Sequence, residues 1–557
     1  MPFEDLGLLF FTVLMLSLLL IPASILFAHY IGAIDNPVGR SVHVQAMPRL
    51  GGLGMALAIL AGLLLFASQG SVMQGFLAGL VIIIITGLAD DIWDISPKLK
   101  FLGQIFASVV FIEISGLMIT SIGNILNLGD ISFPYPIAYL VTIVCFVGTI
   151  NAFNLADGLD GLASGIVAII CFFLGFFALI AQVSDGLIIS IAVFATVLGF
   201  LKFNSHPAKL FMGDTGSLML GFAVSAVAII IVTADTAVIS KPITIMLVLS
   251  MPVVDTLWVM FQRILQGKSP ASADKTHLHH RLLALGLPHS VVVSILYVWV
   301  ALFGALALLV QHIPDYWQLV WGLFLSGGLY ALLVMCEKQK FCFSSRDDFS
   351  QKDEQGEQLE TQKLIKVLGF SMKVFPYVIL AGLSIPVLLT DSFSSTVGKF
   401  ALGLAILVAV AFPWKEHGKR QNIVHGLFYL CGFSILYAWN ITPLHTLNLN
   451  IYMVLFSLLL LLWSALKIKF KSHREVFLTS SFELLLILIS WFVPYIVLPV
   501  LDVSVAVMDA AKLSCLGAIP LLIAMKLTIK QQPHRNKKMA IGLIALLGIV
   551  AMRGLLQ

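Results

Sequence analysis

Long apolar runs alternate with short polar connections along the whole chain. Runs of about 17–25 apolar residues are typical of transmembrane helices. In the first part of the chain such runs lie near residues 5–29, 50–67, 72–89, 101–119, 136–150, 162–181, 187–201, 215–232, 242–262, 291–311 and 316–336. A second series lies near residues 367–390, 398–413, 422–440, 449–466, 476–500, 504–526 and 539–556. The pattern predicts an all-α polytopic membrane protein, with about 11 transmembrane helices in a first domain and about 7 in a C-terminal bundle.

The composition excludes a soluble globular protein. Of the 557 residues, 59% are hydrophobic and only 11% are charged, whereas about 25% of residues are charged in soluble domains. The first apolar run follows Met1–Asp5 without a basic segment or an obvious cleavage site, so we expect a retained span and not a signal peptide. The six cysteines are scattered, and their spacing indicates neither a metal site nor a disulfide framework.

Basic residues fall almost entirely on alternate connections. One set of loops in the first part of the chain contains Arg40, Arg49, Lys98, Lys100, Lys202, Lys209, Arg263, Lys268, Lys275 and Arg281. The other set contains only Lys241. Because loops rich in lysine and arginine stay on the cytoplasmic side, we expect the first set to be cytoplasmic and the N-terminus to lie outside.

A polar, glutamine-rich segment interrupts the apolar runs and suggests a domain boundary. It carries the sequence RDDFSQKDEQGEQLETQK, which is typical of a solvated linker. We therefore predict a membrane domain at residues 1–336, a cytoplasmic linker at 337–366 and a C-terminal transmembrane domain at 367–557.

The stretch Asn151–Gly165, with the sequence NAFNLADGLDGLASG, lies where an apolar run meets the aqueous phase. Asn151, Asn154, Asp157 and Asp160 recur every three residues, so on a helix their side chains would be neighbours. Glycines within the stretch indicate that a helix is loosened or broken there. Polar side chains kept at a membrane edge favour a functional site; an ordinary polar loop is the alternative.

Two further acidic motifs lie on the same predicted side. Asp90 and Asp91 are adjacent at the end of the third apolar run, where they repel each other unless a cation or a proton-transfer role uses them. Asp214 lies among small residues in the segment Asn204–Gly221, just before the eighth run, where a helix N-terminus suits a phosphate and an aspartate suits Mg²⁺. A solvated acidic turn and simple helix capping remain the respective alternatives.

Basic side chains on this side are candidates for phosphate contacts. Arg40, His43 and Arg49 belong to the first loop, although any cytoplasmic loop is expected to be basic. In the loop 268–287, HxHH is a weak zinc pattern because no cysteine or third group is near, so phosphate recognition or a basic patch is favoured. The residues concerned are His277, His279, His280 and Arg281. Glu113, inside the fourth run, is the one conspicuous acid outside the motifs that we expect to be buried, with a structural role or a nearby polar contact.

Acids that can hold a divalent cation and bases that can hold phosphate groups together point to phosphoryl transfer. The motifs ADDIWD, NAFNLADGLDGLASG, PAKLFMGDTGS and SADKTHLHH, in this order, resemble those of the polyprenyl-phosphate N-acetylhexosamine-1-phosphate transferases. The resemblance covers about residues 30–290, and the histidine motif is similar to that of the GlcNAc-type branch. It implies a multi-pass protein of the bacterial inner (cytoplasmic) membrane with a cytoplasmic active site, and Mg²⁺ as cofactor, with Mn²⁺ as an alternative. It also implies transfer of a sugar 1-phosphate from a UDP-N-acetylhexosamine to undecaprenyl phosphate, releasing UMP, in the initiation of cell-surface polysaccharide synthesis.

The same resemblance implies roles for individual residues. The implied catalytic residues are Asp90, Asp91, Asp157, Asp160 and His279, with Asp90 favoured as the base and Asp157 and Asp160 lining the nucleotide site. The implied metal ligands are Asp214 and Asn154. The implied substrate-binding residues are Asn204, Phe211, His277, His280, Arg281, Arg40 and His43, with Phe211 stacking on uracil.

Two features depart from the resemblance. The first loop reads DNPVGRSVH, where many relatives have a second basic residue directly after the arginine. The residues beyond Glu337 have no counterpart in short family members, so a lipid-linked glycan transporter or scaffold that retains a transferase-like module is the alternative function. A homodimer is left open, and no nucleic-acid partner is expected.

Overall fold

The computed structural model confirms the predicted fold class. It describes residues 3–35, 46–234, 241–269, 276–339, 393–411 and 536–555, together with shorter stretches between 376 and 526. Within these residues, nine helices are long and apolar enough to cross a membrane. The total numbers of spans in the two domains stay predictions, because much of the C-terminal part lies outside the described residues.

The chain divides into two compact units. The first comprises Met1–Ser345 with Ser480–Phe482, and the second comprises Arg346–Thr479 and Glu483–Gln557. Apart from Glu337–Gln339, the predicted linker lies outside the described residues, so its boundaries stay a prediction. In the second unit, α15 (Ser395–Ala411) packs against α21 (Asn536–Leu555).

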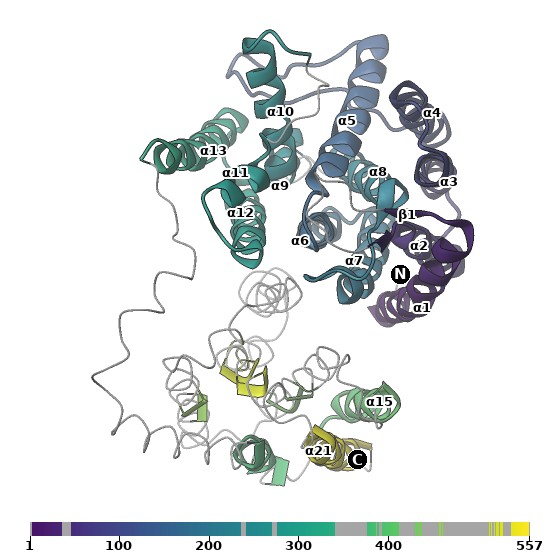
Figure 1. Ribbon diagram of the computed structural model, residues 1–557, viewed down its shortest axis with the longest axis vertical. Coiled ribbons are helices and arrows are strands. Elements are labelled where there is room, and N and C mark those ends of the chain that lie inside the picture. Colours follow the sequence, from purple (N-terminus) through teal and green to yellow (C-terminus); the bar gives the residue numbers. More distant parts are fainter. Residues whose placement is uncertain are drawn as a thin grey trace. The chain divides into compact units, whose positions relative to one another are not determined.

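The first unit is a helical bundle with one short hairpin (Figure 1). The hairpin pairs β1 (Ile34–Asp35) with β2 (Met47–Pro48) in antiparallel register. The helices are α1 (Phe3–Ile31), α2 (Gly51–Phe66), α3 (Ser71–Trp93), α4 (Pro97–Ser115), α5 (Tyr135–Ala156), α6 (Leu162–Ile180), α7 (Ser184–Asn204), α8 (Gly213–Val232), α9 (Pro242–Val248), α10 (Ser250–Leu265), α11 (Leu278–Ala284), α12 (His289–Val310) and α13 (Asp315–Lys338).

Helix α8 is the centre of this bundle. It is buried along almost its whole length and packs against α2, α3, α5, α6 and α7. The close approach of α8 to the neighbouring helices depends on small residues at the contacts, as is usual between membrane helices. A Cβ added to Gly87 would meet the backbone of Thr215, and one added to Gly52 would meet that of Gly216. These contacts bring the first turn of α8 against the end of α3.

The predicted span at residues 242–262 is broken. Helices α9 and α10 are two separate segments that meet at an angle of 86°. The break directs α10 toward the segment that carries the histidines. The prediction that those histidines lie in a loop was wrong. His279, His280 and Arg281 belong to the short helix α11, and His277 directly precedes its first turn.

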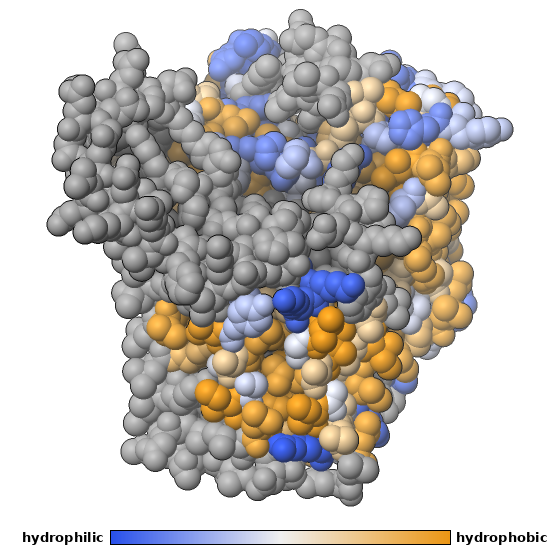
Figure 2. Space-filling model, turned by 60° about the horizontal axis from the view of Figure 1, so that its bottom comes forward, coloured by the Kyte–Doolittle hydropathy of each residue, from blue (hydrophilic) through white to orange (hydrophobic). Residues whose placement is uncertain are grey.

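Hydrophobic side chains remain exposed on the helices, as expected for a surface that contacts lipid. Figure 2 shows broad hydrophobic areas interrupted by hydrophilic patches on one face of the molecule. On α3 and α4, the exposed apolar side chains include Trp93, Leu99, Leu102 and Phe106. Together with the multiple apolar helices, they identify a multi-pass membrane protein.

Candidate active site

Several helix ends that carry polar side chains meet at one end of the first bundle. Asp90 and Asp91 lie in the last turn of α3, and Lys100 lies at the beginning of α4. Asn154 lies in the last turn of α5, and Asp214 lies in the first turn of α8. Hydrogen bonds and ion pairs among Asp90, Lys100, Asn154, Asp214 and the neighbouring Asp91 join all four helices.

Asp91 is buried and binds the N-terminus of α8. Its Oδ1 accepts a hydrogen bond from the backbone N–H of Asp214 at 2.8 Å. Its Oδ2 accepts one from the N–H of Thr215 at 2.9 Å and another from the Thr215 hydroxyl at 2.5 Å. The first N–H groups of a helix have no partner within the helix and carry partial positive charge. Asp91 therefore acts as a cap supplied by a neighbouring helix and fixes the position of Asp214.

Asp90 and Asp214 share one cation, the ammonium group of Lys100. Lys100 Nζ lies 3.2 Å from Asp90 Oδ2 and is also paired with Asp214 Oδ2. Asn154 Nδ2 donates hydrogen bonds to Asp214 Oδ1 at 3.0 Å and to Ser217 Oγ at 2.8 Å. With two carboxylates and one ammonium group, this cluster is negatively charged and can accept further positive charge.

The donor atoms of this cluster suit a hard divalent cation. Mg²⁺ prefers oxygen ligands and usually keeps several waters or phosphate oxygens in its coordination sphere. Carboxylate oxygens from Asp90 and Asp214 and the amide oxygen of Asn154 are such ligands. The ammonium group of Lys100, held between both carboxylates, marks the place where positive charge is stabilised. Between 17% and 24% of the side-chain surface of Asp90, Lys100 and Asp214 is exposed, so an ion can reach them.

The loop between α5 and α6 brings Asp157 and Asp160 to the same end of the bundle. Helix α5 ends at Ala156, which confirms the predicted break in this stretch. Asp157 is half-buried; loss of hydration and then repulsion by the Asp160 and Asp91 carboxylates raise its pKa to about 7. Near neutral pH this carboxyl group can therefore gain or lose a proton.

Asn204 connects two of the site loops. Its Oδ1 accepts a hydrogen bond from the N–H of Gly161 at 2.8 Å, and its Nδ2 donates to the carbonyl of Leu210 at 3.0 Å. Both ends of the amide are thus used within the protein, and Asn204 is buried. Its observed role is to hold the loop after α5 against the loop before α8. Phe211 is half-buried in the second of these loops, where its backbone bonds to Pro48 and Gly51.

A buried carboxylate on α10 orients the histidine segment. Asp255 Oδ2 lies 2.9 Å from His277 Nδ1, and Asp255 Oδ1 accepts hydrogen bonds from the N–H of Leu278 and the hydroxyl of Tyr330, each at 3.0 Å. Arg281 forms a bidentate pair with Glu337 at 2.8 and 2.7 Å. His277 and Arg281 are therefore held by carboxylates of the protein.

His279, like His277, is buried, and its Nε2 has no hydrogen-bond partner. Burial, together with the neighbouring His280, lowers the pKa of His279 to about 3. Its ring is therefore neutral at physiological pH. A Cβ added to Gly158 would collide with Nε2 of His279, so this nitrogen lies directly against the loop between α5 and α6.

Gly158→Ala should therefore displace His279 and lower kcat by about tenfold to a hundredfold, because small displacements at a reacting site are costly. Gly148→Ala, in α5, is the matched control, since a Cβ there meets nothing within 4 Å. Both variants should be assayed for turnover and thermal stability. Equal activity of the two would show that the position of His279 is unimportant.

Sequence reasoning missed two residues of the site. Lys100 was counted only for membrane orientation, although Ser96 and Pro97 predict a helix start that places Lys100 one turn later. Asp255 was overlooked inside an apolar run. The predicted burial of Glu113 was wrong, because Glu113 is exposed, whereas it does make a polar contact by accepting a hydrogen bond from Tyr139. Asp255, by contrast, is a buried acid outside the predicted motifs.

Two predicted substrate-binding residues, Arg40 and His43, lie outside the described residues. Arg49, from the same loop, pairs with Asp35 at 2.7 Å and lies 3.6 Å from Asp94. The described part of the first loop is thus held by carboxylates, and phosphate contacts from Arg40 and His43 stay predictions.

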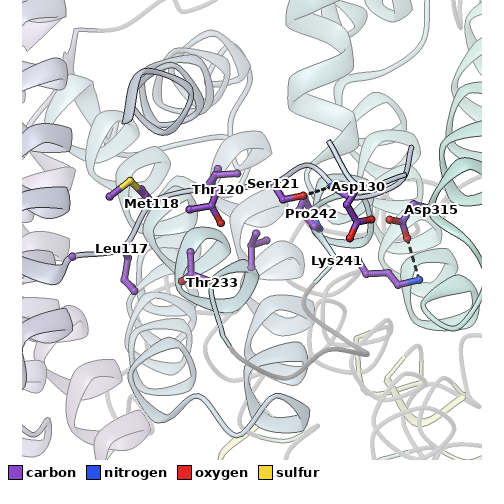
Figure 3. A pocket seen from close by; sticks show the side chains of 13 residues that line it. Leu117, Met118, Thr120, Ser121, Asp130, Thr233, Lys241, Pro242 and Asp315 are labelled. Carbon is purple, nitrogen blue, oxygen red and sulfur yellow. Dashed lines mark hydrogen bonds and ion pairs between the residues drawn. The ribbon is translucent and has the colours of Figure 1, made fainter. Parts of the chain in front are cut away.

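A separate polar cavity of about 550 Å³ lies among the opposite helix ends. It is lined by residues 116–121 after α4, by Asp130 and by residues near the starts of α9 and α13. Figure 3 shows Lys241 and Asp315 at its edge, joined by an ion pair of 3.0 Å. Because Asp214 lies at the other end of α8, this cavity is separate from the carboxylate cluster.

Comparison with known proteins agrees with the resemblance in the motifs. A family model described as glycosyl transferase family 4 matches residues 73–232. The chain is 37% identical over 311 residues to a Bacillus subtilis (strain 168) protein named probable undecaprenyl-phosphate N-acetylglucosaminyl 1-phosphate transferase, with 54% of this chain and 84% of the relative covered. It is 34% identical over 306 residues to the decaprenyl-phosphate N-acetylglucosaminephosphotransferase of Mycolicibacterium smegmatis, with 49% and 75% covered.

A more distant relative has the same type of name. The undecaprenyl-phosphate alpha-N-acetylglucosaminyl 1-phosphate transferase of Escherichia coli (strain K12) is 27% identical over 302 residues, with 53% of this chain and 81% of the relative covered. The similarity thus extends over most of each relative and about half of this chain. On these matches and its helical architecture, the chain belongs to the polyprenyl-phosphate N-acetylhexosamine-1-phosphate transferase family.

Proposed function

We propose that this protein transfers N-acetylglucosamine 1-phosphate from UDP-N-acetylglucosamine to undecaprenyl phosphate and releases UMP. The observation that carries the proposal is the cluster of Asp90, Lys100, Asp214 and Asn154, assembled from four helix ends beside an exposed apolar surface. The names of the relatives support the sugar 1-phosphate and the polyprenyl acceptor. The product would be the starting lipid for a cell-surface polysaccharide.

The proposed reaction exchanges one phosphorus–oxygen bond for another. An oxygen of the lipid phosphate attacks the phosphorus that carries the sugar. The bond between that phosphorus and the oxygen bridging to the nucleoside phosphate breaks, and UMP leaves with the bonding electron pair. Negative charge increases on the bridging oxygen and is spread over the transferred group, so positive charge at that position lowers the barrier.

Asp214 and Asn154 would hold a Mg²⁺ ion, with Mn²⁺ as a substitute, beside the Asp90 carboxylate. When bound, this ion would neutralise charge on the diphosphate. Their oxygen donors and the neighbouring Lys100 fit this assignment. With a bound cation neutralising the Asp90 and Asp214 carboxylates, the Lys100 ammonium group could contact a phosphate oxygen of the substrate instead. Asp90 then positions the lipid phosphate and takes up any proton that it carries.

The remaining residues divide between nucleotide binding and positioning. We assign Asp157, Asp160 and Phe211 to the nucleotide, with the Phe211 ring stacking on uracil. His279, as a neutral imidazole beside Gly158, can donate a hydrogen bond to the diphosphate or the sugar. Asp91 acts through α8, and we assign it a positioning role.

We assign positioning roles to the remaining substrate-binding candidates, because their side chains contact other parts of the protein. Asn204 stabilises the loop after α5 by accepting a hydrogen bond from Gly161. His277 and Arg281 fix the position of α11 by pairing with Asp255 and Glu337, respectively. His280 packs on His279, with ring centroids 4.2 Å apart, and keeps that ring in place.

The lipid acceptor would approach along the exposed faces of α3 and α4. Trp93, Leu99 and Leu102 are each more than half exposed and lie on the same helix ends as Asp90 and Lys100. An apolar chain can cover these side chains while its phosphate reaches the cluster. We place this end of the bundle on the cytoplasmic side of the inner membrane, since basic loops flank it.

The test is an assay of the purified full-length protein with undecaprenyl phosphate, Mg²⁺ and a panel of UDP-sugars. Mass spectrometry of the lipid extract should detect the lipid diphosphate sugar, with UDP-N-acetylglucosamine as the best donor and one UMP formed per product. A product from another UDP-sugar would change the donor, whereas no lipid product from any donor would contradict the proposed reaction.

A further inference from the structure

A second cluster of ligand-type side chains lies close to the nucleotide loop. It consists of Asp160 in the loop between α5 and α6, His206 just after α7, and His289 at the first residue of α12. We propose that these three residues form a binding site for a transition-metal cation such as Zn²⁺, separate from the oxygen-rich cluster at Asp214.

The three side chains are already gathered at ligand spacing. One ligand atom from each lies within 4.8 Å of those from the other two. His206 Nδ1 is 2.7 Å from Asp160 Oδ2, and the rings of His206 and His289 stack with centroids 4.1 Å apart. The N–H of Ala208 donates to the same Asp160 oxygen at 3.1 Å, which orients the carboxylate as outer partners do in metal sites.

His289 gives the independent indication of a ligand. Both of its ring nitrogens are buried and have no hydrogen-bond partner in the protein. A buried polar atom without a partner costs free energy, so native proteins seldom leave one unpaired. A metal bound by one of these nitrogens, together with Asp160 and His206, would satisfy it.

The donor types distinguish this site from the Asp214 cluster. Imidazole nitrogen suits Zn²⁺ and other late first-row metals, whereas all-oxygen donors suit Mg²⁺. Two histidines and one carboxylate supply three ligands, and a water can complete the tetrahedral set that Zn²⁺ favours. The His206 side chain is 52% exposed while that of Asp160 is 10% exposed, so an ion can enter past His206.

Occupation of this site should inhibit the transferase. A metal-bound Asp160 carboxylate can no longer bind the nucleotide, so bound Zn²⁺ and the UDP-sugar would compete. This consequence rests on the proposed function, but binding of the metal does not. The two are therefore measured separately.

The binding test uses Co²⁺ as a spectroscopic probe, added to the full-length protein in excess Mg²⁺ so that oxygen sites are filled. We expect one bound Co²⁺ with a tetrahedral visible spectrum that Zn²⁺ abolishes, and affinity reduced about 10–100-fold in His206→Gln and His289→Gln. His312→Gln is the matched control, because His312 is exposed between α12 and α13. Absence of a bound ion, or equal affinity in all four proteins, would overturn the site, provided that circular dichroism shows the variants folded.

The inhibition test measures turnover against Zn²⁺ at several UDP-sugar concentrations. We expect inhibition that more nucleotide sugar relieves and that His289→Gln weakens about 10–100-fold. Bound metal with unchanged turnover would overturn the inhibitory role. Metal binding in a protein that transfers no sugar phosphate would instead contradict the proposed function and leave the site in place.

Discussion

Asp214→Asn should lower kcat by about 10²–10³-fold, the effect of removing one group that stabilises charge in a transition state. The asparagine keeps the shape of the side chain, and its amide oxygen can still accept the hydrogen bond from Asn154. It removes the negative charge that is paired with Lys100 and that a divalent cation would need. Steady-state turnover over a range of Mg²⁺ concentrations is the measurement, with a weaker dependence on Mg²⁺ expected in the variant.

Asp130→Asn is the matched control for this prediction. Asp130 lies beside the separate cavity among the opposite helix ends, so its amide variant should keep wild-type turnover. The melting temperature of Asp214→Asn should stay near that of the wild type because the backbone of α8 remains capped by Asp91. Wild-type kcat and Mg²⁺ dependence in Asp214→Asn would refute the assignment of Asp214.

Asp91→Ala should reduce both thermal stability and turnover. The change removes the acceptor for three donors at the start of α8, namely two backbone N–H groups and the Thr215 hydroxyl. Each buried donor left without a partner costs about 1–3 kcal/mol of folding free energy. The first turn of α8 would then move, carrying Asp214 away from Lys100. Thermal melting and kcat should be measured on the same preparations.

Asp94→Ala is the control on the same helix end, since the Asp94 side chain is 89% exposed. Its melting temperature should match that of the wild type. Asp91→Asn should also melt early, because its amide group brings a donor toward backbone donors. If Asp91→Ala lost turnover with an unchanged melting temperature, a direct catalytic role would replace the positioning role.

The different roles of Asp90 and Asp91 could not be predicted from their adjacency. Successive residues on a helix point about 100° apart. In the structure one carboxylate turns toward α4 and Lys100, and the other turns toward α8 and Thr215. Which direction serves which role depends on where the neighbouring helices lie, and the local sequence does not contain that information.

The positions of most helices in the first unit followed from apolar runs, because hydropathy reports length and composition well. Hydropathy does not show where a helix axis changes direction, so the break between α9 and α10 was not predicted. Pro252 lies near the start of α10, where proline is tolerated at a helix start, and was an available signal. The break in NAFNLADGLDGLASG was predicted because glycines disfavour a continuous helix.

Asp255 shows a second limit of sequence reasoning. A single carboxylate in an apolar run gives no indication of its partner. Its contacts with His277 and Tyr330 join α10, the segment before α11 and α13, which are far apart in sequence. Only the folded arrangement identifies it as the group that orients the histidine segment.

The most direct test follows each phosphorus of the donor. UDP-N-acetylglucosamine labelled separately at its two phosphorus atoms is incubated with undecaprenyl phosphate, Mg²⁺ and the full-length protein. The phosphorus next to the sugar should appear in the lipid product, and the phosphorus next to uridine should appear entirely in UMP. Recovery of both labels in the lipid, or of both in the aqueous phase while mass spectrometry finds the sugar on the lipid, would contradict transfer of a sugar 1-phosphate at this site.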